Sequence, residues 1–392
     1  MTIDFIAEAN AMREELVERR RDFHQHPELA FEEVRTAGIV AEELNKLGLE
    51  VQTGIGKTGV VGILEGDKEG PTVLVRADMD ALPIIEANQT DYVSTVDGKM
   101  HACGHDGHTA IGLGVAKLFS QHRDKLAGRI KFVFQPAEEI GAGAKAMVAD
   151  GVLQNPEPDV SLGLHLWNTE RVGALNVQTG PVMAGISQFE ITIHGKGAHG
   201  AMPHEGVDPV VCAAQMTLAL QTIVSRNASP LDSAVVTVGQ IIAGTAHNII
   251  PESAKLVGTY RIFREEVRDL ITERLTTIAE HTAAAMGCTV DIHLDHQALP
   301  VSNSEEVIER AKNAWTKLGK ADDFYFERTT ASEDVGVFMQ DIPGMFFFLG
   351  SGNDEKGLNY GHHHPRFDFD EDVLPIGVAV LSAAVAEYIL EA

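Results

Sequence analysis

The sequence lacks any uninterrupted run of about eighteen apolar residues, the length that a membrane-spanning helix requires. Its first residues are acidic and amphipathic, without the basic and apolar segments of a secretory signal, so we expect a cytoplasmic protein. Cysteine is scarce as well. The three cysteines, Cys103, Cys212 and Cys288, are too few and too widely spaced for a disulfide framework, which favours a reducing compartment.

Positive charge is also in short supply. Lys and Arg total 31 against 57 Asp and Glu, which gives the chain a formal net charge of −26. Such a surface repels phosphate backbones and anionic lipid heads, so we expect no nucleic-acid and no membrane partner. A small anionic substrate is still compatible with this charge, because a few local cations can dominate one pocket.

Apolar residues make up 44% of the 392 residues, enough for packed interiors in two domains. At both ends of the chain, segments with apolar residues at helical spacing alternate with short apolar runs. The runs that predict strands are 60–64, 73–75, 130–134, 162–166 and 345–349, and late helices are predicted at 305–318 and 374–390. This alternation predicts an α/β sheet with functional loops at its strand ends.

The middle of the chain has a different pattern. A strand near 189–193 is followed by a helix at about 208–225, strands at 234–238 and 256–262, a helix at 265–285 and a strand at 290–294. This β-α-β-β-α-β order is that of a ferredoxin-like unit. We therefore predict a discontinuous α/β domain, residues 1–184 and 298–392, with a mixed sheet flanked by helices, and an inserted α+β domain at 185–297.

The segment Gly54–Gly59 has the Gly-x-Gly-x-x-Gly spacing of a dinucleotide-binding loop. Such a loop must open a helix, so that the helix N-terminus faces the pyrophosphate. The residues that follow, 60–64, instead predict a strand. A tight turn between two strands is the better interpretation.

Two segments carry residues typical of metal sites. Met100–His108 contains three histidines, a cysteine and an aspartate in a glycine-rich turn, and alternate residues of an extended segment can reach one ion. A polar loop with a free thiol is the alternative. Glu138 and Glu139 follow a predicted strand that ends at Pro136, where one carboxylate could bind metal while the other handles a proton. A solvated acidic pair is the alternative there.

Two further histidine positions complete the set. His165 lies in an otherwise apolar run, where a satisfied core histidine is the commoner case. His362, His363 and His364 precede Pro365 and suggest a ligand loop. Four ligand-rich segments, most at strand ends of one α/β unit, predict a two-metal centre with a spare carboxylate for proton transfer.

In these motifs the sequence resembles the amidohydrolase branch of the M20 metallopeptidase family. This branch includes aminoacylases, hippurate hydrolases and auxin-conjugate hydrolases. The matching segments cover nearly the whole chain: His24–Glu28, Arg76–Pro83, Met100–His108, Glu138–Glu139, Gly195–His199, Asn248–Pro251 and His363–Pro365.

The resemblance implies a set of site residues. Two divalent metal ions, Mn, Zn or Co, would be held by Cys103, His105, Glu139, His165 and His363, with Cys103 as the bridging ligand. Glu138 would be the general base. The sequence departs from the family pattern at His364, where the family has a small or polar residue. The ligand could therefore be His362, His363 or His364, and His363 is chosen because it keeps the family's spacing to Pro365.

The resemblance also implies roles outside the ligand set. The inserted domain would be a lid that forms a homodimer or a tetramer, with His199 reaching the neighbouring active site to support the oxyanion. Asn248 and Arg261 would bind the substrate carboxylate. Supporting roles beside the ligands would fall to Asp78, Asp80, His101, Asp106 and His108. Glu333 and Asp334 also match a family segment, without a physical role that the sequence suggests.

The implied reaction is hydrolysis of N-acyl amino acids, with acetyl, benzoyl or related aryl-acyl groups. A dipeptidase or carboxypeptidase would use the same ligands and the same grip on a carboxylate. The alternative outside enzymes is an inactive metal- or ligand-binding module, against which the retained Glu138 argues.

Overall fold

The computed structural model describes residues 3–390, and these fall into two compact units. The first unit contains the chain up to Val182, Ser302–Arg328 and the chain from Asp334 onward, and the second contains Met183–Val301 and Thr329–Glu333. The short return segment joins the second unit because it pairs with the segment that leads into it. Met183 bridges to Thr329, and Ala184 N–H donates to the Ala331 carbonyl at 3.0 Å.

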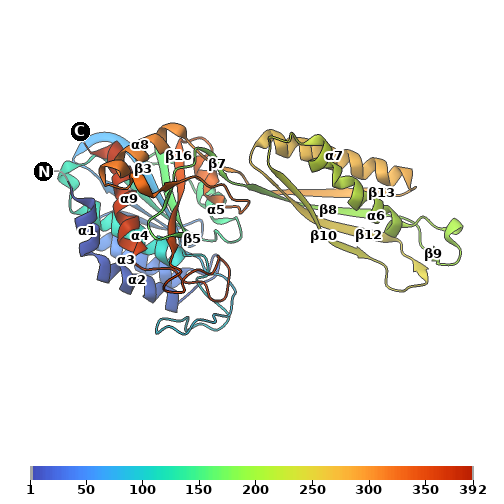
Figure 1. Ribbon diagram of the computed structural model, residues 1–392, viewed down its shortest axis with the longest axis horizontal. Helices are drawn as coiled ribbons and strands as arrows, with labels where there is room; N and C mark the ends of the chain where they lie inside the picture. Colours follow the sequence, from blue (N-terminus) through green and yellow to red (C-terminus); the bar gives the residue numbers. More distant parts are fainter. Residues whose placement is uncertain (1–2, 391–392) are drawn as a thin grey trace. The chain divides into compact units, whose positions relative to one another are not determined.

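The first unit is built on a mixed sheet with helices packed around it (Figure 1). The sheet has eight strands in the order β1-β2-β4-β3-β5-β16-β6-β15. The strands are β1 (Glu50–Ile55), β2 (Gly59–Glu65), β3 (Lys68–Asp78), β4 (Ala127–Gln135), β5 (Val160–Arg171), β6 (Leu175–Asn176), β15 (Phe324–Tyr325) and β16 (Gly344–Gly352). The central strands β4, β3, β5 and β16 are parallel. They are apolar and buried, as expected for strands covered on both faces.

Helices cover this sheet: α1 (Phe5–Ala11), α2 (Arg13–Gln25), α3 (Val34–Lys46), α4 (His105–Ser120), α5 (Gly143–Ala149), α8 (Glu305–Lys317) and α9 (Val373–Ile389). Helix α9 is apolar on nearly every side and is almost wholly buried, whereas α8 buries only one face. The mixed sheet flanked by helices confirms the predicted fold class.

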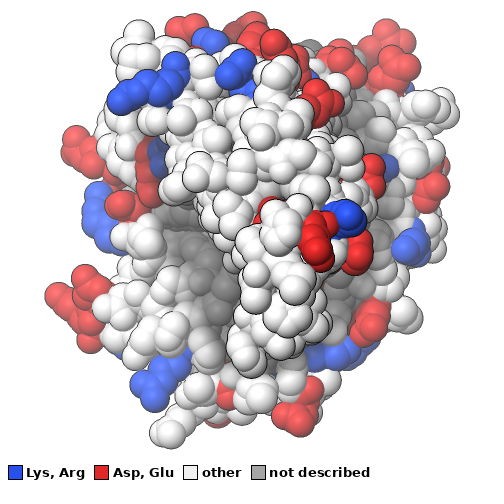
Figure 2. All heavy atoms as spheres, turned by 90° about the vertical axis from the view of Figure 1, so that its right-hand side faces the viewer, with Lys and Arg blue, Asp and Glu red and all other residues white. Residues whose placement is uncertain are grey.

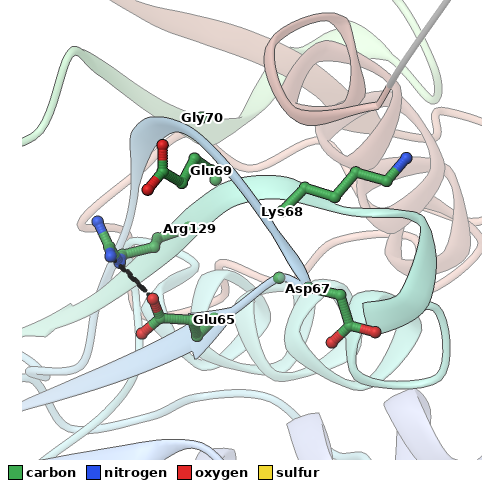
Figure 3. A pocket seen from close by; sticks show the side chains of 8 residues that line it. Glu65, Asp67, Lys68, Glu69, Gly70 and Arg129 are labelled. Atoms are coloured by element: carbon green, nitrogen blue, oxygen red, sulfur yellow. Dashed lines mark hydrogen bonds and ion pairs between the residues drawn. The ribbon is translucent and has the colours of Figure 1, made fainter.

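The parallel strands bring their carboxyl ends to one edge of the sheet, where Asp78 ends β3 and Gln135 ends β4. That edge is the expected place for a functional site. At the opposite end a pocket is lined by residues 65–70 and by Arg129, which forms an ion pair with Glu65 at 2.8 Å (Figure 3). The ligand-rich segments lie at the first edge and not at this pocket.

The turn at Gly54–Gly59 connects β1 to β2 as a hairpin, with Ile55 opposite Gly59. This confirms the tight turn predicted from the sequence. Two of its glycines are explained by packing, since a Cβ atom would lie 2.9 Å from Met147 N on Gly56 and 2.7 Å from Met147 Cε on Gly59, whereas Gly54 has a positive φ of 78°. The motif therefore lets α5 approach the turn closely.

The second unit has the β-α-β-β-α-β order expected from the sequence, with an antiparallel sheet ordered β10-β12-β8-β13. Helices α6 and α7 cover one face of it (Figure 1). Its elements are β8 (Gly185–His194), α6 (Pro209–Leu220), β10 (Ala234–Ala243), β12 (Ser253–Ile262), α7 (Glu265–Ala285) and β13 (Thr289–Ala298). The helix expected to reach residue 225 ends at Leu220 and gives way to a π-helical turn, Ile223–Asn227, in a stretch rich in β-branched residues.

Two features of the structure relate to the membrane and nucleic-acid partners considered from the sequence. Within residues 3–390, no helix combines the length and apolarity needed to cross a membrane. Among the described residues on the face in Figure 2, basic side chains stand between acidic ones and form no continuous basic field.

Candidate functional site

Cys103 and His105 lie where the chain enters α4. The sequence predicted an extended or turn-like segment, but His105 is the first residue of the helix, because Gly104 adopts a left-handed conformation (φ 95°) that turns the chain into it. His165 reaches the same place from β5. Its Nε2 lies 3.6 Å from Cys103 Sγ, and the ligand atoms of these three residues all lie within 4.8 Å of one another.

Both histidines are oriented through their other ring nitrogen. His105 Nδ1 donates to the Asp80 carbonyl at 2.9 Å, and His165 Nδ1 donates to the Leu166 carbonyl at 2.7 Å. These bonds fix the ring orientations, so that Nε2 is the nitrogen that each imidazole can offer to a metal ion. His105 Nε2 is buried and has no hydrogen-bond partner. A buried ring nitrogen in this position is suited to a metal ion.

A second group shares Cys103 with the first. Cys103, Glu139 and His363 also bring their ligand atoms within 4.8 Å of one another, and Glu139 Oε2 lies 3.3 Å from His363 Nε2. The Glu139 backbone N–H donates to Asp80 Oδ2 at 3.0 Å, and its Oε1 is a second buried atom without a partner. Cys103 therefore stands between two overlapping ligand groups, as a bridging ligand would.

The three consecutive histidines separate clearly. His363 has a positive φ (64°), and its backbone N–H donates to the Ala102 carbonyl at 2.7 Å, which directs its ring toward Glu139. His362 Nε2 donates to the Leu166 carbonyl at 2.9 Å. The His364 ring stacks on Tyr360 with centroids 4.5 Å apart. Of the three, His363 is the one that joins a ligand group.

Glu138 is buried beside these groups. Its Oε2 lies 3.8 Å from His105 Nε2, and it forms a third group with His105 and Glu139. It belongs to neither group that contains Cys103. The adjacent glutamates therefore occupy different positions, since Glu139 shares a group with Cys103 and Glu138 does not.

The charges around these residues fit a cation. Burial, together with the charges of Glu139 and Glu138, raises the pKa of the Cys103 thiol. Burial alone would lower the pKa of His105, but Asp78 and Asp80 raise it to about 10. A divalent ion would stabilise the thiolate and replace the proton on the imidazole. Thiolate, imidazole and carboxylate together form a donor set suited to a divalent transition metal.

The residues expected to support the ligands have defined contacts. His108 Nδ1 donates to Asp78 Oδ1 at 2.6 Å, and its Nε2 accepts the Leu166 N–H at 2.8 Å, which ties β3 to β5. Asp106 accepts from Arg20 Nε at 2.8 Å. His101 is buried with neither ring nitrogen bonded, and burial lowers its pKa to about 4.

No role was predicted for three buried residues behind the site, of which His24 and Asp334 lie in segments that match the family and Arg20 does not. Arg20 is wholly buried on α2 and binds Asp106 and Asp368, while His24 Nδ1 lies 2.7 Å from Asp106. The available signal was the spacing of Arg20 and His24, since residues four positions apart lie on one face of a helix. Asp334, for which the sequence suggested no role, accepts from Gln135 Nε2 at 2.5 Å and from the Ala144 N–H at 2.9 Å. It thus holds both ends of the segment that carries Glu138.

The other predicted residues belong to the second unit. His199 is exposed on the short strand β9 (Ala198–His199), which pairs with β11 (Ile249–Ile250). Asn248 is exposed next to β11, and its carbonyl accepts the Gly200 N–H at 2.8 Å. Arg261 lies half-buried on β12, with Nη1 2.5 Å from Thr259 Oγ1. Their roles remain predictions.

Fold and site together define a class. An α/β unit that gathers two overlapping groups of candidate ligands beside a further buried carboxylate, at the carboxyl ends of its parallel strands, has the parts of a metal-dependent hydrolase. Comparison with known proteins gives the family. Residues 74–387 match the model of peptidase family M20/M25/M40, and the chain belongs to this family. The resemblance noted in the sequence is confirmed, and the protein is a hydrolase of the amidohydrolase and peptidase type.

Relatives cover nearly the whole chain. N-acetyl-L-cysteine deacetylase of Bacillus subtilis is 40% identical over 365 residues, which are 93% of this chain and 86% of that protein. Thermostable carboxypeptidase 2 of Saccharolobus solfataricus is 38% identical over 366 residues, 92% of each. The crystal structure of the Bacillus subtilis YXEP protein, described as a dinuclear metal binding peptidase, matches with a TM-score of 0.85 at 34% identity, covering 96% of this chain and 99% of that one.

Proposed function

We propose that the protein is a two-metal amidohydrolase that cleaves N-acyl amino acids, with acetyl, benzoyl or related aryl-acyl groups, into a carboxylic acid and a free amino acid. The observation that carries the proposal is the position of Glu138, which is buried next to His105 and Glu139 but outside the two groups that share Cys103. A retained carboxylate in that position suits proton transfer. The N-acetyl-L-cysteine deacetylase relative supports an acyl amino acid as substrate.

The residues divide the chemistry between them. Cys103, His105, Glu139, His165 and His363 would hold two divalent ions, Mn, Zn or Co. When bound, such ions polarise the scissile carbonyl and lower the pKa of bound water to about 7. Glu138 accepts the proton from the attacking water and delivers it to the leaving nitrogen, so one carboxylate serves as base and then as acid.

The second unit would bind the substrate carboxylate. Arg261 has no acidic partner among residues 3–390, and burial lowers the pKa of its guanidinium, so an anion would be a favourable neighbour. It lines a hollow of about 390 Å³ on the sheet with Gln188 and Gln297. We assign Asn248 to the same carboxylate and His199 to the oxyanion.

We further propose that this unit forms a homodimer in which His199 serves the neighbouring active site. The edge strand β10 exposes Val235, Ile241 and Ile242, and an exposed apolar edge favours pairing with a second copy. A tetramer would need a second contact between such dimers. A cytoplasmic location stays a prediction from the sequence.

The second candidate function is a dipeptidase or carboxypeptidase. It has the same ligand set and the same use for Arg261, and one relative is named a carboxypeptidase. The two substrates differ in the group on the acyl side, since a peptide carries a charged amino group there. An inactive binding module is the candidate outside enzymes, and Glu138 is the residue that it would not need.

A hydrolysis panel tests the proposal. Purified protein loaded with Mn, Zn or Co is given acetyl-, benzoyl- and indoleacetyl-amino acids, dipeptides, and the amide of each acyl amino acid as a matched control without a carboxylate. We expect release of free amino acid from the acyl substrates, and poor cleavage of the amides. Preference for dipeptides would favour the peptidase, and no hydrolysis of any substrate would refute both enzymes.

A further inference from the structure

The loop between β4 and α5, residues 136–142, holds Glu138 and Glu139 in an unusual backbone conformation. Ala137 has a φ of 52°, a left-handed conformation that residues with a side chain rarely adopt. Such a conformation persists when surrounding contacts impose it. Ala137 directly precedes Glu138, the proposed base, so the contacts that hold Ala137 also affect the position of Glu138.

The Ala137 carbonyl accepts the Ala142 and Gly143 N–H groups at 3.3 and 3.1 Å, within its own loop. The contact from outside the loop is a buried carboxylate from a distant segment. Glu33, which precedes α3, is wholly buried, and its Oε1 accepts the Ala137 N–H at 2.9 Å. The same oxygen accepts the Phe31 N–H at 2.9 Å, and Oε2 accepts from Thr58 Oγ1 at 2.5 Å. Three donors thus converge on one side chain.

Glu33 is not needed for the helix that it precedes. It occupies the N-cap position of α3, yet its side chain makes no capping hydrogen bond. The free N–H groups of this helix start are bound by Glu28 instead, which accepts from Arg35 N and Thr36 N at 2.9 and 2.8 Å. Burying a carboxylate is unfavourable, so its position calls for another explanation than capping.

The glycine-rich turn that carries Thr58 is itself held in place by other contacts. Thr58 lies in this turn, Lys57 Nζ lies 3.8 Å from the centroid of the Phe31 ring, and Gly56 N–H donates to Asp150 Oδ2 at 2.7 Å. Asp150 caps the end of α5, the helix that follows the Glu138 loop. The turn that resembles a nucleotide-binding motif is thereby fixed to both sides of the loop.

We propose that Glu33 is a positioning residue, which sets the direction of Glu138 by holding the backbone of Ala137. The role of Glu138 as base is that of the proposed function, on which this inference rests. Glu33 acts through hydrogen bonds and not through charge. A glutamine could keep them, because its amide oxygen can accept both N–H groups and its nitrogen can donate to Thr58 Oγ1.

The test compares Glu33→Ala with Glu33→Gln in metal-saturated protein. We expect Glu33→Ala to lower kcat about 10- to 100-fold, with KM and metal content near wild type, as for other residues that orient a catalytic group. Glu33→Gln should stay close to wild type. Thr58→Val, a milder change for the case that Glu33→Ala does not fold, should lower kcat in the same direction by less. Asp159→Ala removes a carboxylate that accepts the Thr72 N–H at 2.7 Å at the far end of the sheet, and it should leave kcat unchanged.

A second readout does not depend on activity. Amide hydrogen exchange over residues 135–143 should be faster in Glu33→Ala than in wild type, Glu33→Gln or Asp159→Ala. Unchanged kcat or unchanged exchange in Glu33→Ala would overturn the inference, and so would an equal loss in Glu33→Gln. If the wild type hydrolyses no substrate, the proposed function fails, and the exchange rates still decide whether Glu33 holds the loop.

Discussion

Glu138 and Glu139 are neighbours in sequence with different surroundings. Glu139 has its backbone fixed by Asp80 and its carboxylate next to His363, whereas Glu138 lies beside His105 outside the groups that share Cys103. A base and a ligand should fail in different ways. Glu138→Gln should keep near-normal metal content and lose about two to four orders of magnitude in kcat, the usual range for general acid–base catalysis.

Glu139→Gln is the matched variant, and it should lose metal and activity together. The measurement is elemental analysis of each purified variant alongside its turnover. Metal loss in Glu138→Gln with retention in Glu139→Gln would reverse the two assignments.

The three cysteines provide an internally controlled prediction. Cys103 belongs to both ligand groups, while Cys212 and Cys288 lie in the core of the second unit. Cys103→Ala should therefore lower metal occupancy, because one bridging donor serves both positions. Cys212→Ala and Cys288→Ala should leave metal content at the wild-type level, as measured by elemental analysis. Equal metal loss in all three variants would show that Cys103 is no ligand.

At the scale of the element, the loop before α5 has no spare room. A Cβ atom on Gly143 would lie 1.6 Å from the Pro136 carbonyl oxygen, so α5 and the loop would have to shift. Gly143→Ala should destabilise the fold by about 1–3 kcal/mol, as overpacking does, and lower kcat as well. Gly38→Ala is the control, because its Cβ meets nothing within 4 Å in the middle of α3. It should raise stability by about 0.5–1 kcal/mol. Thermal melts at fixed metal concentration measure both, and wild-type behaviour of Gly143→Ala would contradict the packing.

Element boundaries could be predicted where the hydrophobic period is unbroken. The 21-residue helix α7 begins and ends where the sequence predicted. Strand β10 runs to Ala243 although its pattern ended at Val238, because a register shift between Val238 and Gln240 interrupts the alternation that marks a strand.

For the candidate site, the sequence predicted what local spacing encodes and not the contacts between distant positions. Residues close in sequence, such as Cys103 and His105, could be found from their spacing. The contacts from Asp80 to Glu139 and from Glu33 to Ala137 span 59 and 104 positions, and no local pattern encodes them. The sequence favoured His363 over His362 and His364 by its spacing to Pro365 alone, because the feature that distinguishes His363 in the structure is a backbone conformation.

At the scale of the whole molecule, the inserted unit provides the prediction. If the partner subunit's His199 completes each active site, His199→Ala should lower kcat with metal content and dimer intact. Mixing His199→Ala with Glu138→Gln should then restore activity, because each heterodimer has one site with both residues. Random exchange in a symmetric dimer gives about a quarter of wild-type activity. Verified subunit exchange without any recovery would show that His199 does not act across an interface.

The central claim is that amide hydrolysis depends on two metal ions held around Cys103. The most direct measurement is titration of metal-free protein with Mn, Zn or Co, following bound metal by elemental analysis and hydrolysis of an N-acyl amino acid in the same samples. We predict no turnover without metal and full turnover at two ions per subunit, as for two-metal hydrolases. Full turnover by verified metal-free protein would contradict the account.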